Sequence, residues 1–177
     1  MILSRTKNEP LHYMLKIEYF SILSKDPTVS INIESDVFEA ASHKWRLDLH
    51  PIGNEEEGVD DYISLYLIIC DTESLSKGWK LRFDVNFFVY DHIRHEYITF
   101  QDGRGNRTMF DENQIKWGFD ELISLEDFKK SSNGYISNDS CVFGAEVFAV
   151  PEFTLKDRCL SFISPPETLN TLLLDCE

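Results

Sequence analysis

Residues 81–90 alternate between apolar and more polar side chains with a period of two, which is the repeat of an extended strand. One face of this segment is entirely apolar: Leu81, Phe83, Val85, Phe87 and Val89. The same alternation is present in residues 13–19, 45–49, 63–69 and 143–149, where β-branched and aromatic side chains dominate. Such side chains suit a pleated surface that is buried on one face. The chain is therefore predicted to fold mainly from strands.

Turn-forming dipeptides separate the alternating segments at short intervals. They are Asp26-Pro27, Gly53-Asn54, Lys77-Gly78, Asp102-Gly103 and Asn133-Gly134. Several short strands joined by such turns, with few helical stretches between them, are typical of an antiparallel β-sandwich or barrel. We therefore predict an all-β fold.

One short helix is expected to begin after Ser124, whose hydroxyl suits the position that caps a helix N-terminus. Glu126 and Asp127 would lie in the first turn, where the helix dipole favours negative charge. Leu125 and Phe128 would then face the interior.

The charge balance argues against two classes of partner. The chain carries 17 basic and 31 acidic residues, a formal net charge of −14. Nucleic acids and anionic membranes are bound mainly through Lys and Arg, so neither is expected as a partner. Residues 1–10 lack the apolar core of a secretory signal, and no stretch reaches the roughly 18–20 apolar residues of a membrane span. We expect the protein in the cytoplasm, with the nucleus as the alternative.

No sequence motif for catalysis, cofactor binding or metal binding stands out. His92 and His95 follow a predicted strand and the turn-forming Asp91, which favours a solvated loop over a metal site. Residues 103–108 begin like a glycine-rich dinucleotide loop, but they join two strand-like segments instead of opening a helix. The acidic residues 55–61 lack the ligand spacing of a calcium loop. We therefore expect no catalytic residue, no cofactor and no metal.

The chain has four cysteines, Cys70, Cys141, Cys159 and Cys176. No two of them have the C-x-x-C spacing of a zinc or redox site, so they are expected to be free thiols in a reducing compartment. Cys70 lies in an alternating segment, which predicts a buried and unreactive thiol. A hydrolase that uses a thiol such as Cys70 is the alternative from another functional class.

Five segments together resemble a known protein family, the MATH (meprin and TRAF homology) domain. In order along the chain they are residues 42–54 (SHKWRLDLHPIGN), 61–67 (DYISLYL), 78–83 (GWKLRF), 117–119 (WGF) and 134–141 (GYISNDSC). With residues 13–21 resembling the opening strand, the resemblance covers about residues 10–150 and is closest to plant MATH-only proteins. It implies a MATH domain over residues 8–151 and a tail, residues 152–177, that is similar to the connector between tandem MATH domains.

The resemblance implies an eight-stranded antiparallel TRAF-like β-sandwich. MATH domains of this family hold an extended peptide of another protein in a shallow groove, partly by main-chain hydrogen bonds to the strand with the W-G-F signature. This is β-augmentation, in which backbone pairing supplies affinity and side-chain pockets supply selectivity. The expected function is therefore an adaptor that binds peptide motifs of other proteins in a ubiquitin-linked or plant defence pathway. Self-association would supply multivalency.

The positions of the family's groove can be carried over to this chain one by one. The predicted peptide-binding residues are Tyr66, Val85, Thr108, Lys116, Trp117, Gly118 and Phe119. Tyr66 would lie in the groove floor, and residues 117–119 would form the edge strand, with Gly118 allowing close backbone approach. Trp117 and Phe119 could equally pack in the core, with one ring of the pair pointing each way.

Three of these positions depart from the family pattern. Val85 stands where relatives often have Phe, Thr108 replaces an aromatic residue, and Lys116 replaces an acidic one. Lys116 is therefore expected to favour an acidic residue in the ligand. A remnant domain without a working groove is the second alternative.

Overall fold

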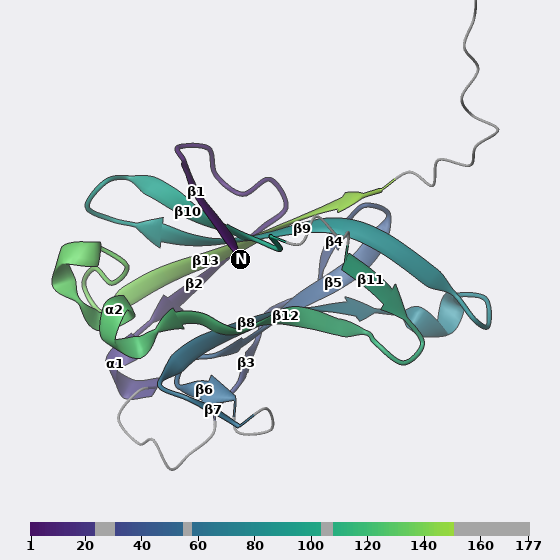
Figure 1. Ribbon diagram of the computed structural model, residues 1–177, viewed down its shortest axis with the longest axis horizontal. Coiled ribbons are helices and arrows are strands. Elements are labelled where there is room, and N and C mark those ends of the chain that lie inside the picture. The colour runs from purple at the N-terminus through teal and green to yellow at the C-terminus, as the bar shows by residue number, and fades with distance from the viewer. Residues whose placement is uncertain (24–30, 55–57, 104–107, 151–177) are drawn as a thin grey trace, which may run out of the picture.

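Two antiparallel β-sheets packed face to face form the body of the protein (Figure 1). The structure is a computed structural model that describes residues 1–23, 31–54, 58–103 and 108–150. Every pair of strands among these residues is antiparallel. The predicted all-β antiparallel sandwich is therefore confirmed.

The first sheet has the strand order β1-β10-β9-β13-β2, and β11 also pairs with β9. Its strands are β1 (Ile2–Thr6), β2 (Tyr13–Glu18), β9 (Lys80–Asp91), β10 (Glu96–Gln101), β11 (Thr108–Asp111) and β13 (Ser140–Ala149). The alternating segment that first indicated strands is β9. It is long enough to pair with β10 and β11 along one edge and with β13 along the other.

The second sheet has the order β12-β8-β5-β3, and β4 pairs with β5. Its strands are β3 (Ile33–Glu34), β4 (Phe38–Ala40), β5 (His43–His50), β8 (Tyr62–Cys70) and β12 (Lys116–Ser124). A separate two-stranded ribbon consists of β6 (Gly53–Asn54) and β7 (Val59–Asp60). The described residues thus form more strands than the eight that the family resemblance implied.

The core lies between the two sheets and is formed by the apolar faces that the alternation predicts. Trp45 is fully buried, with its ring 4.8 Å from that of Phe83 and 5.2 Å from that of Phe110, both edge-on. Its indole N–H donates to the carbonyl of Ala40 at 2.9 Å, so the one polar atom of this ring is satisfied. Burying each large apolar side chain contributes about 1.5–3 kcal/mol, which makes this aromatic cluster a main source of stability.

Among the described residues, two short α-helices lie at one end of the sandwich, α1 (Phe20–Leu23) and α2 (Leu125–Lys129). The 3-10 turn η3 (Ser131–Asn133) directly follows α2 at this end, and a second one, η2 (Thr72–Ser74), follows β8. The predicted helix is α2, and the Ser124 hydroxyl accepts from the backbone N–H of Asp127 at 3.2 Å. Phe128 is buried and stacks on Phe143 at 5.8 Å. Sequence reasoning missed α1, which is too short to show helical periodicity.

Several predictions lie outside the described residues: the acidic segment at 55–57, residues 104–107, and the tail 152–177 with Cys159 and Cys176. The two described cysteines, Cys70 and Cys141, are free thiols. Among the described residues no helix is both long and apolar enough to span a membrane.

Candidate functional site

β12 forms one edge of the second sheet, because within the described chain β8 is its single strand partner. The backbone N–H of Ile69 donates to the carbonyl of Ile115 at 3.0 Å, so this pair of residues is hydrogen-bonded across the ladder. Hydrogen-bonded pairs alternate along an antiparallel ladder with pairs whose backbone groups point away from the partner strand. In this register the N–H and C=O groups of Lys116 and Gly118 are therefore directed away from β8, toward the open edge.

Two hollows follow this edge. One, of about 560 Å³, is lined by Met1, Val59, Asp102, Trp117, Gly118, Phe119, Asp120 and Glu121. The other, of about 800 Å³, is lined by Met1, Leu3, Ser4, Arg5, Tyr62, Ile98, Phe100, Glu121, Leu122, Ile123, Ser124, Asp127, Asn133 and Tyr135. Because both hollows share Met1 and Glu121, we treat them as one groove along β12, called the β12 groove below.

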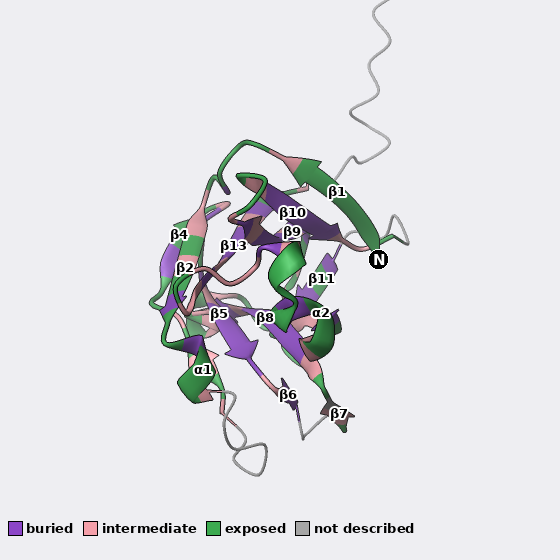
Figure 2. Ribbon diagram, turned by 90° about the vertical axis from the view of Figure 1, so that its left-hand side faces the viewer, coloured by how far each residue is buried: buried purple, intermediate pink, exposed green. Residues whose placement is uncertain are grey.

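The two sheets supply opposite walls of the β12 groove. β12 lines it on the second sheet, while β1 and β10 line it on the first. β1 is the exposed outermost strand of its sheet and pairs with β10 (Figure 2). The groove therefore lies where the edges of the two sheets come together.

Trp117 and Phe119 lie on the same face of β12 and both contact Phe87 in the core. The Trp117 ring stacks on the Phe87 ring at 5.8 Å, and the Phe119 ring meets it edge-on at 6.0 Å. The expectation that one ring points each way is wrong, since residues two apart in a strand share a face. Both rings are half-buried and also line the β12 groove, so each has a core side and a groove side.

Gly118 is placed where only glycine fits. A Cβ atom there would lie 2.6 Å from the Cα atom of Tyr66 and in direct collision with the carbonyl oxygen of Leu65. The predicted close backbone approach at Gly118 is thus made by the neighbouring strand β8. The backbone N–H and C=O groups of Gly118 itself remain directed toward the groove.

Tyr66 lies on the outer face of the second sheet, because it pairs with Gly118 and alternates with the core residues Leu65 and Leu67. Its hydroxyl donates to Oδ1 of Asp120 at 2.6 Å and accepts from Nδ2 of Asn54 at 3.0 Å. Burial and the Asp120 carboxylate raise the pKa of Tyr66, so its phenol stays protonated. The structure therefore places Tyr66 behind the edge strand, where it holds Asp120 in position.

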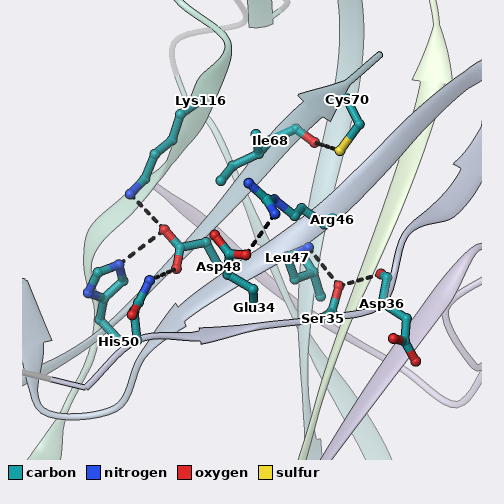
Figure 3. Close-up of polar contacts among 11 residues, drawn as sticks. Glu34, Ser35, Asp36, Arg46, Leu47, Asp48, His50, Ile68, Cys70 and Lys116 are labelled. Carbon is teal, nitrogen blue, oxygen red and sulfur yellow. Dashed lines mark hydrogen bonds and ion pairs between the residues drawn. The ribbon is translucent and has the colours of Figure 1, made fainter.

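Lys116 is already engaged with the protein's own acid. Its Nζ atom lies 2.7 Å from Oδ2 of Asp48 (Figure 3). The same atom lies 4.0 Å from the centre of the Tyr66 ring. Asp48 is 3% exposed and also contacts His50 at 3.1 Å. Burial alone would raise the pKa of Asp48, but the hydrogen bonds from His50 and Lys116 outweigh it and lower the pKa to about 2. The charge of Lys116 is thus balanced within the fold.

Val85 and Thr108 lie away from the β12 groove. Both side chains are buried, Val85 in β9 and Thr108 in β11, and neither is among the residues that line the two hollows. The structure thus brings together Trp117, Gly118 and Phe119 at the groove and sets Val85 and Thr108 in the interior.

Sequence reasoning missed several residues of the groove. Asp120 and Glu121 directly follow the W-G-F signature, and Asp102 is the first residue after β10. The position of Asp120 and Glu121 beside that signature was a usable signal. The contribution of β1 had no such signal, because its pairing with β10 spans most of the chain.

The thiol alternative finds no support in the surroundings of Cys70. Its Sγ atom donates to the carbonyl of Ile68 at 3.8 Å, and the side chain is half-buried. Burial raises the pKa of Cys70, whereas a nucleophilic thiol needs a lowered one.

The sequence model of the MATH domain matches residues 12–147. This match covers more than half of the chain and spans both sheets. The chain belongs to the MATH-domain family. MATH domains are generally interaction domains without enzymatic activity of their own.

Similar proteins include two from Arabidopsis thaliana and one of known structure from Notothenia coriiceps. A MATH domain and coiled-coil domain-containing protein of Arabidopsis thaliana is 34% identical over 134 residues, which are 76% of this chain and 46% of the relative. Ubiquitin C-terminal hydrolase 12 of the same plant is 31% identical over 64% of this chain and 10% of its own length. The chain thus spans under half the length of these relatives. TRAF5 of Notothenia coriiceps shares the fold, with a TM-score of 0.55 and 20% identity over 81% of this chain and 75% of that one.

Proposed function

We propose that this MATH domain binds an extended segment of a partner protein along β12 by β-augmentation. The observation that carries the proposal is the open edge of β12, where the backbone groups of Lys116 and Gly118 point away from β8 into a groove. A guest strand would pair with these groups and place alternate side chains in the two hollows.

The affinity expected for such a guest is modest. A short peptide buries less than the roughly 1,200 Å² of a standard protein interface, so a dissociation constant near the micromolar range follows. Effective binding would then need several copies, supplied by self-association or by partner chains. Two relatives carry the name ubiquitin C-terminal hydrolase, and this supports, within the proposal, a role in a ubiquitin-linked pathway.

Amide hydrogen exchange tests the proposal at single residues. Peptides that bind the purified domain would be selected from a displayed random library, and exchange would be measured with and without the best binder. We expect the amides of Lys116 and Gly118 to become protected, because they gain a partner. The amides of Trp117 and Phe119 serve as internal controls, since they already face β8. Binding that leaves Lys116 and Gly118 unprotected would contradict the proposal.

A further inference from the structure

The charges around the β12 groove have one dominant sign. The hollow over Trp117 and Phe119 is bordered by the exposed carboxylates of Asp120 and Glu121, and none of its described lining residues is a Lys or Arg. Asp120 and Glu121 are exposed at the rim, where a ligand can reach them.

Two described basic side chains beside the groove, those of Lys116 and Arg5, are already paired with other acids. Lys116, at the start of β12, is held by the buried Asp48 at 2.7 Å. Arg5, in the wall of the second hollow, lies 3.0 Å from Asp91 and 3.9 Å from Glu96. Neither cation is therefore placed to balance Asp120 and Glu121. The field in the groove is negative, in line with the net charge of −14.

The second hollow differs in chemistry because much of its wall is apolar. Leu3 from β1, Ile98 and Phe100 from β10, and Leu122 from β12 contribute to it. Leu3 is 58% exposed, although it lies beside these buried residues. β1 lies before residue 12, where the match to the MATH domain begins, so this part of the wall belongs to the chain's own N-terminal segment.

From the negative charge and the apolar wall of the β12 groove we propose that its guest is a segment of a partner protein that carries both basic and apolar residues. A Lys or Arg of the guest faces the carboxylates of Asp120 and Glu121, and an apolar side chain farther along the guest enters the hollow beside Leu3. The inference rests on the proposed function, since it names the ligand chemistry of the same groove. It reverses the ligand preference that Lys116 suggested in the sequence, because Lys116 is engaged with Asp48. Opposite charges at an interface favour selectivity and fast association.

Three pools of short synthetic peptides of equal length test the inference. The central residue is Lys, Gln or Glu, and the other positions are mixtures of uncharged residues. We expect the immobilised domain to retain the Lys pool roughly tenfold more than the Glu pool, with the Gln pool between them. The preference should fall toward unity in the double variant Asp120→Asn, Glu121→Gln. The Asn side chain can still accept the Tyr66 hydroxyl, so the local structure is kept.

A charge-matched control separates a local effect from the general charge of the protein. The double variant Asp36→Asn, Glu39→Gln removes two exposed carboxylates at β4 and its approach, which lie beyond β8 and β5 from β12. It should keep the full preference for Lys. Equal retention of the pools, preference for Glu, or an equal loss in this control would each overturn the inference.

The apolar hollow has its own matched pair of variants. Leu3→Ser should weaken binding of the most enriched Lys peptide several-fold, whereas Ile22→Ser, at another exposed apolar residue in α1, should not. Equal effects would overturn this part of the inference.

Hydrogen exchange with the enriched peptides distinguishes failure of this inference from failure of the proposed function. If a Glu peptide alone protects the amides of Lys116 and Gly118, only the charge preference is contradicted. If these amides are protected by none of the peptides, the proposed function itself is contradicted.

Discussion

The Nζ atom of Lys116 lies 2.7 Å from Oδ2 of Asp48, so an ion pair across the outer face of β8 ties the edge strand β12 to β5. Asp48 has a nearly buried side chain, while that of Lys116 is 34% exposed. Loss of Lys116 would leave a buried carboxylate with two side-chain partners, His50 at 3.1 Å and Nδ2 of Asn32 at 3.4 Å, neither of which is a lysine or arginine.

We expect Lys116→Met to lower the free energy of unfolding by about 1–3 kcal/mol, because breaking a buried pair strands the remaining charge, and partial exposure reduces the cost. Chemical denaturation measures it. Lys44→Met is the matched control, since Lys44 pairs with Asp71 at 2.6 Å where both side chains are exposed. A loss of stability as large in the control would contradict this reading.

Acid should weaken the fold partly through Asp91. Its side chain is fully buried at the end of β9 and lies 2.8 Å from Arg94 and 3.0 Å from Arg5. Burial alone would raise the pKa of Asp91, but hydrogen bonds from Arg94 and Arg5 outweigh it and lower the pKa from 3.8 to about 2. A lowered folded-state pKa means that the carboxylate stabilises the fold above about pH 4, and that this stabilisation is lost as the pH falls toward about 2.

Asp91→Asn should therefore reduce stability near neutral pH and flatten its decline below about pH 4. Urea midpoints measured across this range give both effects. Asp84→Asn, at an exposed carboxylate of the same strand, is the control and should leave the acid decline in place. A decline of unchanged steepness in Asp91→Asn would show that other groups dominate acid unfolding.

Gly118→Ala should destabilise the domain by about 1–3 kcal/mol, because the added methyl group meets backbone atoms of Leu65 and Tyr66 that cannot rotate away. It should also abolish peptide binding by displacing β12. Gly103→Ala is the control, since the nearest atom there, Cγ1 of the Ile2 side chain, lies at 3.3 Å. Thermal unfolding of the two variants tests this, and equal melting temperatures would count against it.

Trp117→Ala should lower the free energy of unfolding by about 2–4 kcal/mol. The Trp117 ring is stacked on Phe87, so removing it leaves a cavity between the sheets. Phe148→Ala, which removes an aromatic ring that is 40% exposed on β13, should cost much less. Chemical denaturation compares them. For this reason Trp117 is a poor choice for a variant that tests binding alone, and exposed positions such as Glu121 are better.

Thiol labelling of the folded protein should be slow at Cys70 and slower still at Cys141, because burial raises the pKa of both thiols, that of Cys141 to about 12. The experiment uses the variant Cys159→Ser, Cys176→Ser, so that Cys70 and Cys141 alone report. Mass spectrometry after brief labelling reads each site. Labelling of Cys70 faster than a simple thiol in solution would revive the hydrolase alternative.

Local patterns in the sequence predicted one helix and five of the strands, β2, β5, β8, β9 and β13. The alternation in β9 and β8 reports burial on one face, which a strand determines within its own residues. The cap at Ser124 likewise depends on neighbours a few residues away, and α2 was therefore predicted correctly. The W-G-F segment was also placed correctly on an edge strand.

Contacts between distant segments could not be predicted in this way. The partner of Lys116 is Asp48, and the partner of Arg5 is Asp91, and neither pairing leaves a trace in local composition. The ligand preference suggested by Lys116 came from the residue type alone. This interpretation changed because the structure shows that Lys116 is paired with Asp48.

The pairing of β2 with β13 brings Tyr13 opposite Ala145. During synthesis the first of these strands leaves the ribosome long before its partner exists, so the first sheet cannot close until nearly all described residues have emerged. Folding dominated by such remote pairings is slow. The same pairing places the two ends of the region that matches the MATH domain side by side. Complete domains of this kind can therefore follow one another along one polypeptide without interrupting a sheet.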